Sequence, residues 1–247
     1  VFLDGPVCRR LAVLDFDPER GELVPGARSV GPARPNQPGH YELPRGHDLG
    51  DPAFLQAAVF GGVYKTLATF EEPDALGRRV DWAFDGPQLL IVPRAGDWAN
   101  AFYERDSRSI QFFQFVPDGA AEPLLTASSQ DIIAHETAHA VIDGVAPDLY
   151  QATHPQGLAI HEAIADIATL LMAFRSRKLA ARVLEQSGGS LERPSAFTSV
   201  AEQFGRALRE NRHALRNLLN DRKLDPASSD PHALSEVLSG ALYAVMV

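Results

Sequence analysis

Two histidines and a glutamate within five residues form the clearest candidate for chemistry in the sequence. His135 and His139 stand four residues apart in the stretch AHETAHAVIDGVAPDLYQ, and Glu136 follows the first of them. Residues four apart share one face of a helix, so both imidazoles can converge on one metal ion. Glu136, about 100° further round the helix, can reach a water on that ion without binding the metal itself. The pattern predicts a zinc site that activates water.

A polar stripe on the next predicted helix supplies the remaining ligand. The stretch AIHEAIADIATLLMAF is apolar almost all round, except for Glu162, Asp166 and Thr169. Buried carboxylates are costly unless they are paired or bind a metal. We therefore expect Glu162 to be the third zinc ligand and Asp166 to accept the free ring N–H of His135. The alternative is that both carboxylates form salt bridges with arginines inside a helical core.

Three protein ligands leave the fourth position of a tetrahedral zinc ion for water, which is typical of catalytic rather than structural sites. Zinc lowers the pKa of such a water to roughly 7, which gives a nucleophile at neutral pH. Glu136 would accept the proton of this water and pass it to the leaving nitrogen, a role worth about 10²- to 10⁴-fold in rate. Cys8 is the only cysteine, so a thiolate metal cluster and an internal disulfide are excluded.

These motifs resemble those of the thermolysin family of zinc metalloendopeptidases, the glutamate-ligand branch (gluzincins) of the HExxH enzymes. DIIAHETAHAVIDGVAPDLYQ is similar to the zinc helix of the family and the segment after it, and HEAIADI is similar to its third-ligand motif. The match covers four separate segments across roughly residues 88 to 243. The resemblance implies one Zn²⁺ ion, bound by His135, His139 and Glu162, and a peptide or protein substrate.

Other residues of the family's active site have counterparts here. The resemblance implies that Tyr150, eleven residues after His139, helps to hold the tetrahedral intermediate. PHALSEVLSGALY is similar to the segment that bears the catalytic histidine, which implies that His232 stabilises the oxyanion, a role typically worth about 10²- to 10³-fold. NAFYERDSRSIQFF looks like the family's edge strand, where Asn100 and the backbone of Ala101 would bind the substrate by strand addition.

The chain departs from the family pattern in its charged residues. The acidic partner of the catalytic histidine is not at its usual place, and Asp230 or Asp225 could replace it. The substrate-binding arginine has one loose candidate, Arg193 in GGSLERPS. Asp131 matches a calcium ligand, but its acidic partners are replaced by the basic stretch AFRSRKLAARVLEQ. We therefore do not predict calcium, and we interpret Asp131 as part of a capping box with Ser128.

Two other function classes use the same residues. A zinc exopeptidase would need a group that holds the free amine of the substrate, and no glycine-rich acidic motif of the related aminopeptidases is present. A non-catalytic, zinc-stabilised peptide-binding protein would have no use for Glu136. A zinc-dependent endopeptidase therefore accounts for the most residues.

The remaining sequence predicts an α+β fold in two parts, which must position these residues. Residues 1–126 are expected to form a β-rich N-terminal lobe, with one long helix that Asp51 and Pro52 begin and with the substrate-binding edge strand. Residues 127–247 are expected to form a helical lobe with the zinc helix at the junction. Its helices are predicted at about residues 129–143, 157–175, 177–186, 196–219 and 232–247.

The bulk composition excludes some classes of partner. A net charge of -9 over 247 residues argues against a nucleic-acid partner, and we interpret the arginines from Arg206 to Arg216 as a solvated helix face. The longest clean apolar run, Ile167 to Phe174, is shorter than the roughly 20 residues of a membrane span, so no membrane partner is predicted. The chain begins with Val1, which we take to indicate a processed or trimmed piece. The resemblance suggests secretion, an intracellular protease stays open, and no oligomeric state is predicted.

Overall fold

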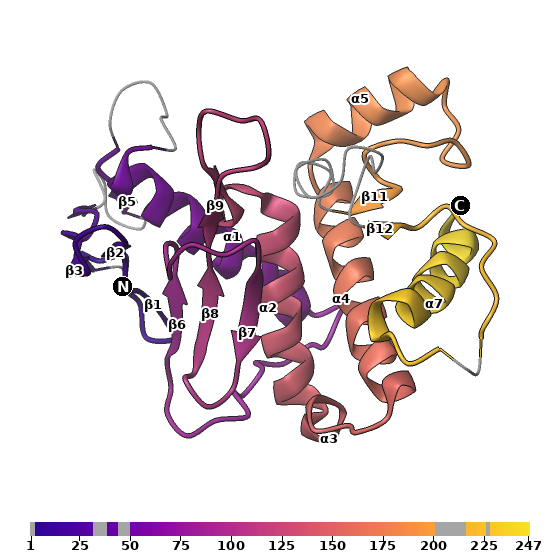
Figure 1. Ribbon diagram of the computed structural model, residues 1–247, viewed down its shortest axis with the longest axis horizontal. Helices are drawn as coiled ribbons and strands as arrows, with labels where there is room; N and C mark the ends of the chain where they lie inside the picture. Colours follow the sequence, from indigo (N-terminus) through magenta and orange to yellow (C-terminus); the bar gives the residue numbers. More distant parts are fainter. Residues whose placement is uncertain (1–2, 32–38, 44–49, 201–215, 226–227) are drawn as a thin grey trace. The chain divides into compact units, whose positions relative to one another are not determined.

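The computed structural model describes residues 3–31, 39–43, 50–200, 216–225 and 228–247 (Figure 1). Helices and small sheets occur together, so the fold is mixed α+β, as predicted. The chain forms two compact units, Val1–Ile133 and Ala134–Val247. The boundary between them falls inside helix α2 (Gln130–Val145), whereas the sequence suggested a boundary before that helix.

A four-stranded sheet is the centre of the first unit. Its strands lie in the order β1-β6-β8-β7, with the bounds β1 Leu11–Val13, β6 Leu89–Val92, β8 Ser109–Phe112 and β7 Ala101–Glu104. Strands β1 and β8 run parallel to β6, whereas β7 is antiparallel to β8 and forms an edge of the sheet. In the sequence, QLLIVP is typical of a buried strand and NAFYERDSRSIQFFQFV of a hairpin, and β6 and the β7–β8 pair confirm both predictions.

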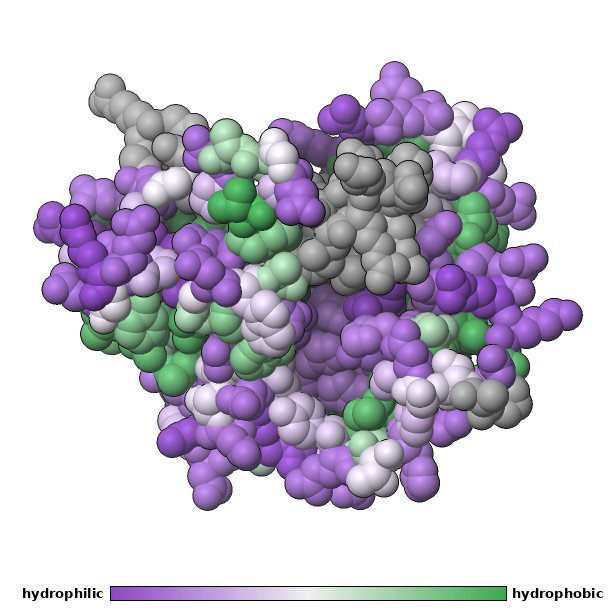
Figure 2. All heavy atoms as spheres, in the orientation of Figure 1, coloured by the Kyte–Doolittle hydropathy of each residue, from purple (hydrophilic) through white to green (hydrophobic). Residues whose placement is uncertain are grey.

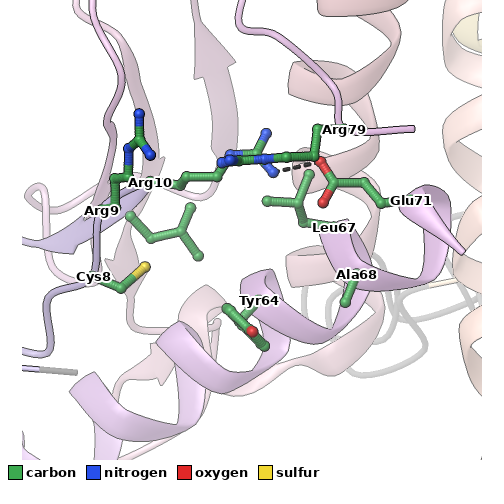
Figure 3. A pocket seen from close by; sticks show the side chains of 9 residues that line it. Cys8, Arg9, Arg10, Tyr64, Leu67, Ala68, Glu71 and Arg79 are labelled. Atoms are coloured by element: carbon green, nitrogen blue, oxygen red, sulfur yellow. Dashed lines mark hydrogen bonds and ion pairs between the residues drawn. The ribbon is translucent and has the colours of Figure 1, made fainter. Parts of the chain in front are cut away.

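Helix α1 (Pro52–Glu71) connects two parallel strands of this sheet and packs against β1. The carboxylate of Asp51 accepts a hydrogen bond from the backbone N–H of Phe54, so the predicted helix start is confirmed. At the other end of α1, Glu71 forms an ion pair with Arg10, the residue before β1. Figure 3 shows this pair beside the recess between residues 8–11 and α1, with Tyr64 on the helix side. The long helix is thus fixed to the sheet at its C-terminal end.

Short two-stranded ladders complete the first unit. They are β2 (Phe16–Asp17) with β3 (Glu22–Leu23), β4 (Ser29–Val30) with β5 (His40–Tyr41), and β9 (Gln114–Phe115) with β10 (Leu124–Leu125), and the 3-10 helix η1 (Thr126–Ser128) follows. The segments RRLAVLDFD and ELVPGARSV, joined by the turn PERG, are typical of a hairpin, which is present only as β2 and β3. Strand β1 pairs with β6 instead, because its three residues are all buried and β6 lies in the core.

The second unit is mostly helical. It contains the remainder of α2, then α3 (Pro147–Tyr150), α4 (Pro155–Phe174), α5 (Arg177–Ser187), β11 (Ser199–Val200), β12 (Arg216–Asn217) and α7 (Pro231–Met246). Helices α4 and α7 pack against each other along much of their length. Most buried residues on these helices are small, such as Ala163, Ala165, Ser239 and Gly240. Small residues allow two helix backbones to approach closely.

The structure corrects the two ends of the helix predicted over residues 196–219. Ser199–Val200 (β11) and Arg216–Asn217 (β12) form an antiparallel ladder there, and residues 201–215 lie outside the described residues. Arg216 lies in β12 and is 6% exposed, so its assignment to a solvated helix face was wrong. The start of α2 is also corrected. Ser129, not Ser128, accepts a hydrogen bond from the N–H of Ile132, at 3.4 Å.

One helix in the described part of the chain, α4, is long and apolar enough to span a membrane by length and composition alone. The core helix of a soluble protein passes the same test. Glu162 and Asp166 lie in the middle of α4 and interact with side chains of other elements of the second unit, as expected of a core helix. Figure 2 shows mostly hydrophilic residues on the visible face, consistent with the many charged residues of the chain.

Two mid-helix glycines are expected to respond in opposite ways to alanine. A Cβ at Gly240 in α7 would lie 2.7 Å from Nδ2 of Asn220, whose amide donates to the carbonyls of Asn217 and Glu236. Gly240→Ala should displace this amide and lower the free energy of unfolding by about 1 kcal/mol. A Cβ at Gly61 in α1 meets no atom within 4 Å, so Gly61→Ala should raise stability by up to about 1 kcal/mol. Urea unfolding of both variants tests this, and a gain of stability in both would contradict the packing described.

Candidate metal centre

Side chains from α2 and α4 meet in the second unit. His135 Nε2 lies 3.0 Å from His139 Nε2 and 3.3 Å from Glu162 Oε2, and His139 Nε2 lies 3.5 Å from Glu162 Oε1. Ligand atoms about 2.0–2.1 Å from a tetrahedral zinc ion are about 3.3 Å from one another. The three groups therefore have the spacing of three corners of a zinc coordination tetrahedron.

Glu162 Oε2 is buried and accepts no well-formed hydrogen bond among the described residues. Its nearest cationic neighbour is a terminal nitrogen of Arg216, 3.3 Å away. A buried carboxylate oxygen without a hydrogen bond is costly, and a metal ion bound beside it would remove that cost. The residues present therefore fit a metal ion of the zinc type.

Glu136 is the second carboxylate close to the histidines. One ligand atom from each of His135, Glu136 and His139 lies within 4.8 Å of the others. Adjacent residues on a helix point about 100° apart, so Glu136 approaches from the side of the imidazole pair. Glu162 comes from a different helix and contacts both Nε2 atoms, which makes it the better ligand candidate.

Asp166 contacts the other nitrogen of the first histidine, as the sequence predicted. Its Oδ1 atom lies 3.2 Å from His135 Nδ1, and the carboxylate is fully buried. An acceptor at Nδ1 keeps a proton on that nitrogen, so a metal ion that displaces the other ring proton would bind at Nε2.

Arg216 is a buried residue of this site that the sequence did not reveal. Its Nε atom donates to Asp166 Oδ1 at 2.8 Å, and one terminal nitrogen lies 3.3 Å from Glu162 Oε2 and 3.0 Å from His135 Nε2. The structure therefore contains both arrangements considered for the polar stripe: the carboxylates pair with an arginine, and they also lie next to the two histidines. The sequence contained one sign of this arginine, because two buried carboxylates need a cation close to them.

The formal charges around the site are mostly negative. Glu136, Glu162 and Asp166 contribute three negative charges and Arg216 one positive charge, so their sum is -2 (-3 + 1), or -1 when His135 is protonated. Burial and Arg216 lower the pKa of His135, but hydrogen bonds with the two carboxylates of α4 outweigh them and raise it to about 9. The site therefore attracts positive charge at this imidazole.

The other ionisable groups keep the charge state that metal binding requires. Burial raises the pKa of Glu162, yet the nearby His139, His135 and Arg216 hold it well below its ordinary value. Burial lowers the pKa of His139 well below its ordinary value. Glu162 is thus ionised and His139 neutral at neutral pH, as metal ligands must be.

His232 lies at the first turn of α7, close to the same centre. Its Nε2 atom is 3.6 Å from Glu162 Oε2, and its Nδ1 atom is 3.5 Å from Oδ1 of Asp230. Asp230 also caps α7 by accepting the backbone N–H of His232. Of the two acidic partners considered from the sequence, Asp230 is the one that the structure brings to this imidazole. The His232 side chain is 60% exposed, so it is accessible to a substrate.

Another histidine, His161, contacts the second imidazole of the site. Its Nδ1 atom lies 2.6 Å from His139 Nδ1, and the His161 residue is 6% exposed. Tyr150, the last residue of α3, lies with its ring centre 6.1 Å from that of His161 in a T-shaped arrangement. The structure therefore brings Tyr150 to the rim of the histidine cluster. In the sequence, the only sign that His161 lies at this site was its position directly before Glu162.

The proposed substrate-binding residues belong to other elements of the chain. Asn100 and Ala101 belong to the first unit, where Asn100 precedes the edge strand β7 and Ala101 begins it. Arg193 is exposed and donates to the backbone carbonyl of Ser187, near the C-terminal end of α5. Arg216, and not Arg193, is the arginine that the structure brings to the histidines.

No family model matches the chain, and no curated protein matches it. Any function must therefore be inferred from the residues and their geometry.

The buried guanidinium is expected to matter most when no metal is bound. Arg216→Met leaves Asp166 and Glu162 buried without their cation, which should lower the free energy of unfolding of the zinc-free protein by about 3–5 kcal/mol. Saturating Zn²⁺ should recover part of this loss, because the ion supplies positive charge at the same carboxylates.

The matched control is Arg28→Met. Arg28 and its partner Glu42, 3.9 Å apart, are both exposed, so the loss of this pair should cost about 1 kcal/mol or less. Denaturant unfolding with and without Zn²⁺ measures both variants. Equal, small losses for the two arginines would show that Arg216 does not compensate the buried carboxylates.

Proposed function

We propose that this protein is a zinc-dependent endopeptidase of the thermolysin type, which hydrolyses internal peptide bonds. The observation that carries the proposal is the meeting of His135 Nε2, His139 Nε2 and the Glu162 carboxylate at zinc-ligand spacing, with Glu136 beside them. The resemblance of the HETAH and HEAIAD segments to the thermolysin family supports the same function.

His135, His139 and Glu162 would hold one Zn²⁺ ion. When bound, zinc lowers the pKa of a coordinated water to roughly 7 and polarises the substrate carbonyl. The Glu136 carboxylate accepts the proton of this water and transfers it to the leaving nitrogen of the substrate, as a general base and then a general acid. Asp166 holds His135 in the tautomer that presents Nε2.

Three further side chains would bind the developing oxyanion and the substrate. His232 and Tyr150 are hydrogen-bond donors at the edge of the cluster, and His232 is open to solvent. Donors directed at an oxyanion typically contribute about 10²- to 10³-fold in rate. Arg216 replaces Arg193 as our candidate for the arginine that binds a substrate carbonyl, because its guanidinium lies at the ligand set.

A purely structural role explains fewer of these residues. A carboxylate–arginine cluster would account for Glu162, Asp166 and Arg216, but it does not require two imidazole Nε2 atoms to converge 3.0 Å apart. A structural zinc site usually has four protein ligands, whereas three protein ligands leave a position for water. A structural zinc site would also need no general base, which is the role that Glu136 has in this proposal.

The proposed function also assigns a role to each of two lobes. We infer a β-rich lobe, whose edge strand β7 adds the substrate chain as a further strand at Asn100 and Ala101, and a helical lobe that carries the zinc site. The place of β7 as the last strand of the four-stranded sheet supports this role, because a peptide adds to a sheet at an edge strand.

The general base separates catalysis from metal binding. Glu136→Gln keeps the shape of the side chain but removes its proton acceptor, so peptide cleavage should fall by about 10²- to 10⁴-fold. Zinc content, measured by atomic emission after dialysis, should remain one ion per chain. Undiminished cleavage by this variant would overturn the catalytic assignment.

The contact of Asp166 with His135 should be visible in zinc affinity. Asp166→Ala removes the acceptor that orients the imidazole, so zinc affinity should fall by about 10- to 100-fold. Competition with a fluorescent chelator measures this affinity. If the variant binds zinc as tightly as wild type does, Asp166 does not orient His135 for zinc binding.

A further inference from the structure

His161 has no place in the function proposed above, although its side chain touches the second zinc ligand candidate. The two Nδ1 atoms of His139 and His161 are 2.6 Å apart, and the ring planes differ by 8°. Parallel rings in face contact stay about 3.5 Å apart, so a 2.6 Å separation means that the rings meet edge to edge. The contact is therefore a hydrogen bond nearly in the plane of both rings.

One proton must lie between these two nitrogens, and zinc binding would decide which ring carries it. His139 faces Glu162 and His135 with Nε2, so this atom must be the one without a proton when it binds a metal. A neutral His139 then carries its proton on Nδ1 and donates it. His161 must accept with Nδ1, and its own proton lies on Nε2.

The consecutive residues His161 and Glu162 therefore hold the His139 ring from both sides. Glu162 lies 3.5 Å from Nε2, and His161 lies 2.6 Å from Nδ1. His161 is not a metal ligand in this arrangement, because its contact is with the nitrogen that faces away from the ligand set. Its Nε2 atom is buried and has no hydrogen-bond partner in the described part of the chain, which leaves a donor for a water or a neighbouring carboxylate.

We propose that His161 is a positioning residue that orients the zinc ligand His139 and fixes its tautomer, as Asp166 does for His135. This inference rests on the proposed zinc site. A neutral acceptor at one ligand histidine and a carboxylate at the other add less negative charge than two carboxylates. The ligand set thus keeps a lower net charge while both imidazoles are fixed.

Three variants test this role through zinc affinity, measured by chelator competition. His161→Leu removes the acceptor and should weaken zinc binding by about 10- to 100-fold. His161→Asn places an oxygen at the same position from the backbone as Nδ1, so it should retain affinity within a few fold of wild type. His154→Leu, at the exposed start of the same helix, is the matched control and should bind zinc as wild type does.

A second measurement, on the wild-type protein, finds which ring nitrogens carry a proton. A role of His161 in packing alone would not determine these positions. In zinc-loaded protein with ¹⁵N-labelled histidine, NMR shifts should show a proton on Nδ1 of His139 and on Nε2 of His161. A proton on Nδ1 of His161, or equal zinc affinity in wild type and His161→Leu, would overturn the inference. Failure of wild type to bind zinc at all would instead overturn the proposed function, so the two results are distinguishable.

Discussion

The second unit depends on how the buried carboxylates of α4 are neutralised. Asp166 is fully buried and Glu162 is largely so, and both lie on a helix that is otherwise suited to an apolar core. Their partners are two imidazoles from α2 and the guanidinium of Arg216 from β12. Since an unpaired buried charge costs several kcal/mol, these elements are held together by the same groups that could bind a metal. Stability and the candidate chemistry therefore share one set of residues.

Arg216 contacts atoms that would themselves bind the metal. Its guanidinium contacts His135 Nε2, one of the atoms that would bind the metal, and Oε2 of Glu162. The same anionic environment raises the pKa of His135 to about 9, in spite of burial and of Arg216. A site with this charge attracts a divalent cation, and the arginine limits how much negative charge remains when the cation is absent. The proposed peptidase would use the same guanidinium for the substrate once zinc has replaced it beside Nε2.

Local signals in the sequence predicted much of the fold and the candidate ligands. Helix α1, the strand in QLLIVP, the hairpin of β7 and β8, and helices α4, α5 and α7 follow from hydrophobic periodicity and capping residues such as Asp51. The contact of Asp166 with His135 followed from the i, i+4 stripe of carboxylates. Non-local pairing could not be predicted: β1 pairs with β6 across 78 residues (89 - 11), and β12 enters a ladder with β11, although arginines and leucines near it suggested a helix. Arg216 and His161 were missed for the same reason, because only tertiary contact gives these residues their role.

The proposed endopeptidase needs one zinc ion and one general base in the second unit. The most direct measurement is a digest of a mixed peptide library, read by mass spectrometry, with zinc-loaded protein and with protein stripped by a chelator. A zinc endopeptidase should cut internal bonds of blocked and free peptides alike, and these cuts should disappear with the chelator and return when Zn²⁺ is restored. The absence of cleavage by protein that carries one zinc ion per chain, or cleavage that persists after zinc is removed, would contradict it.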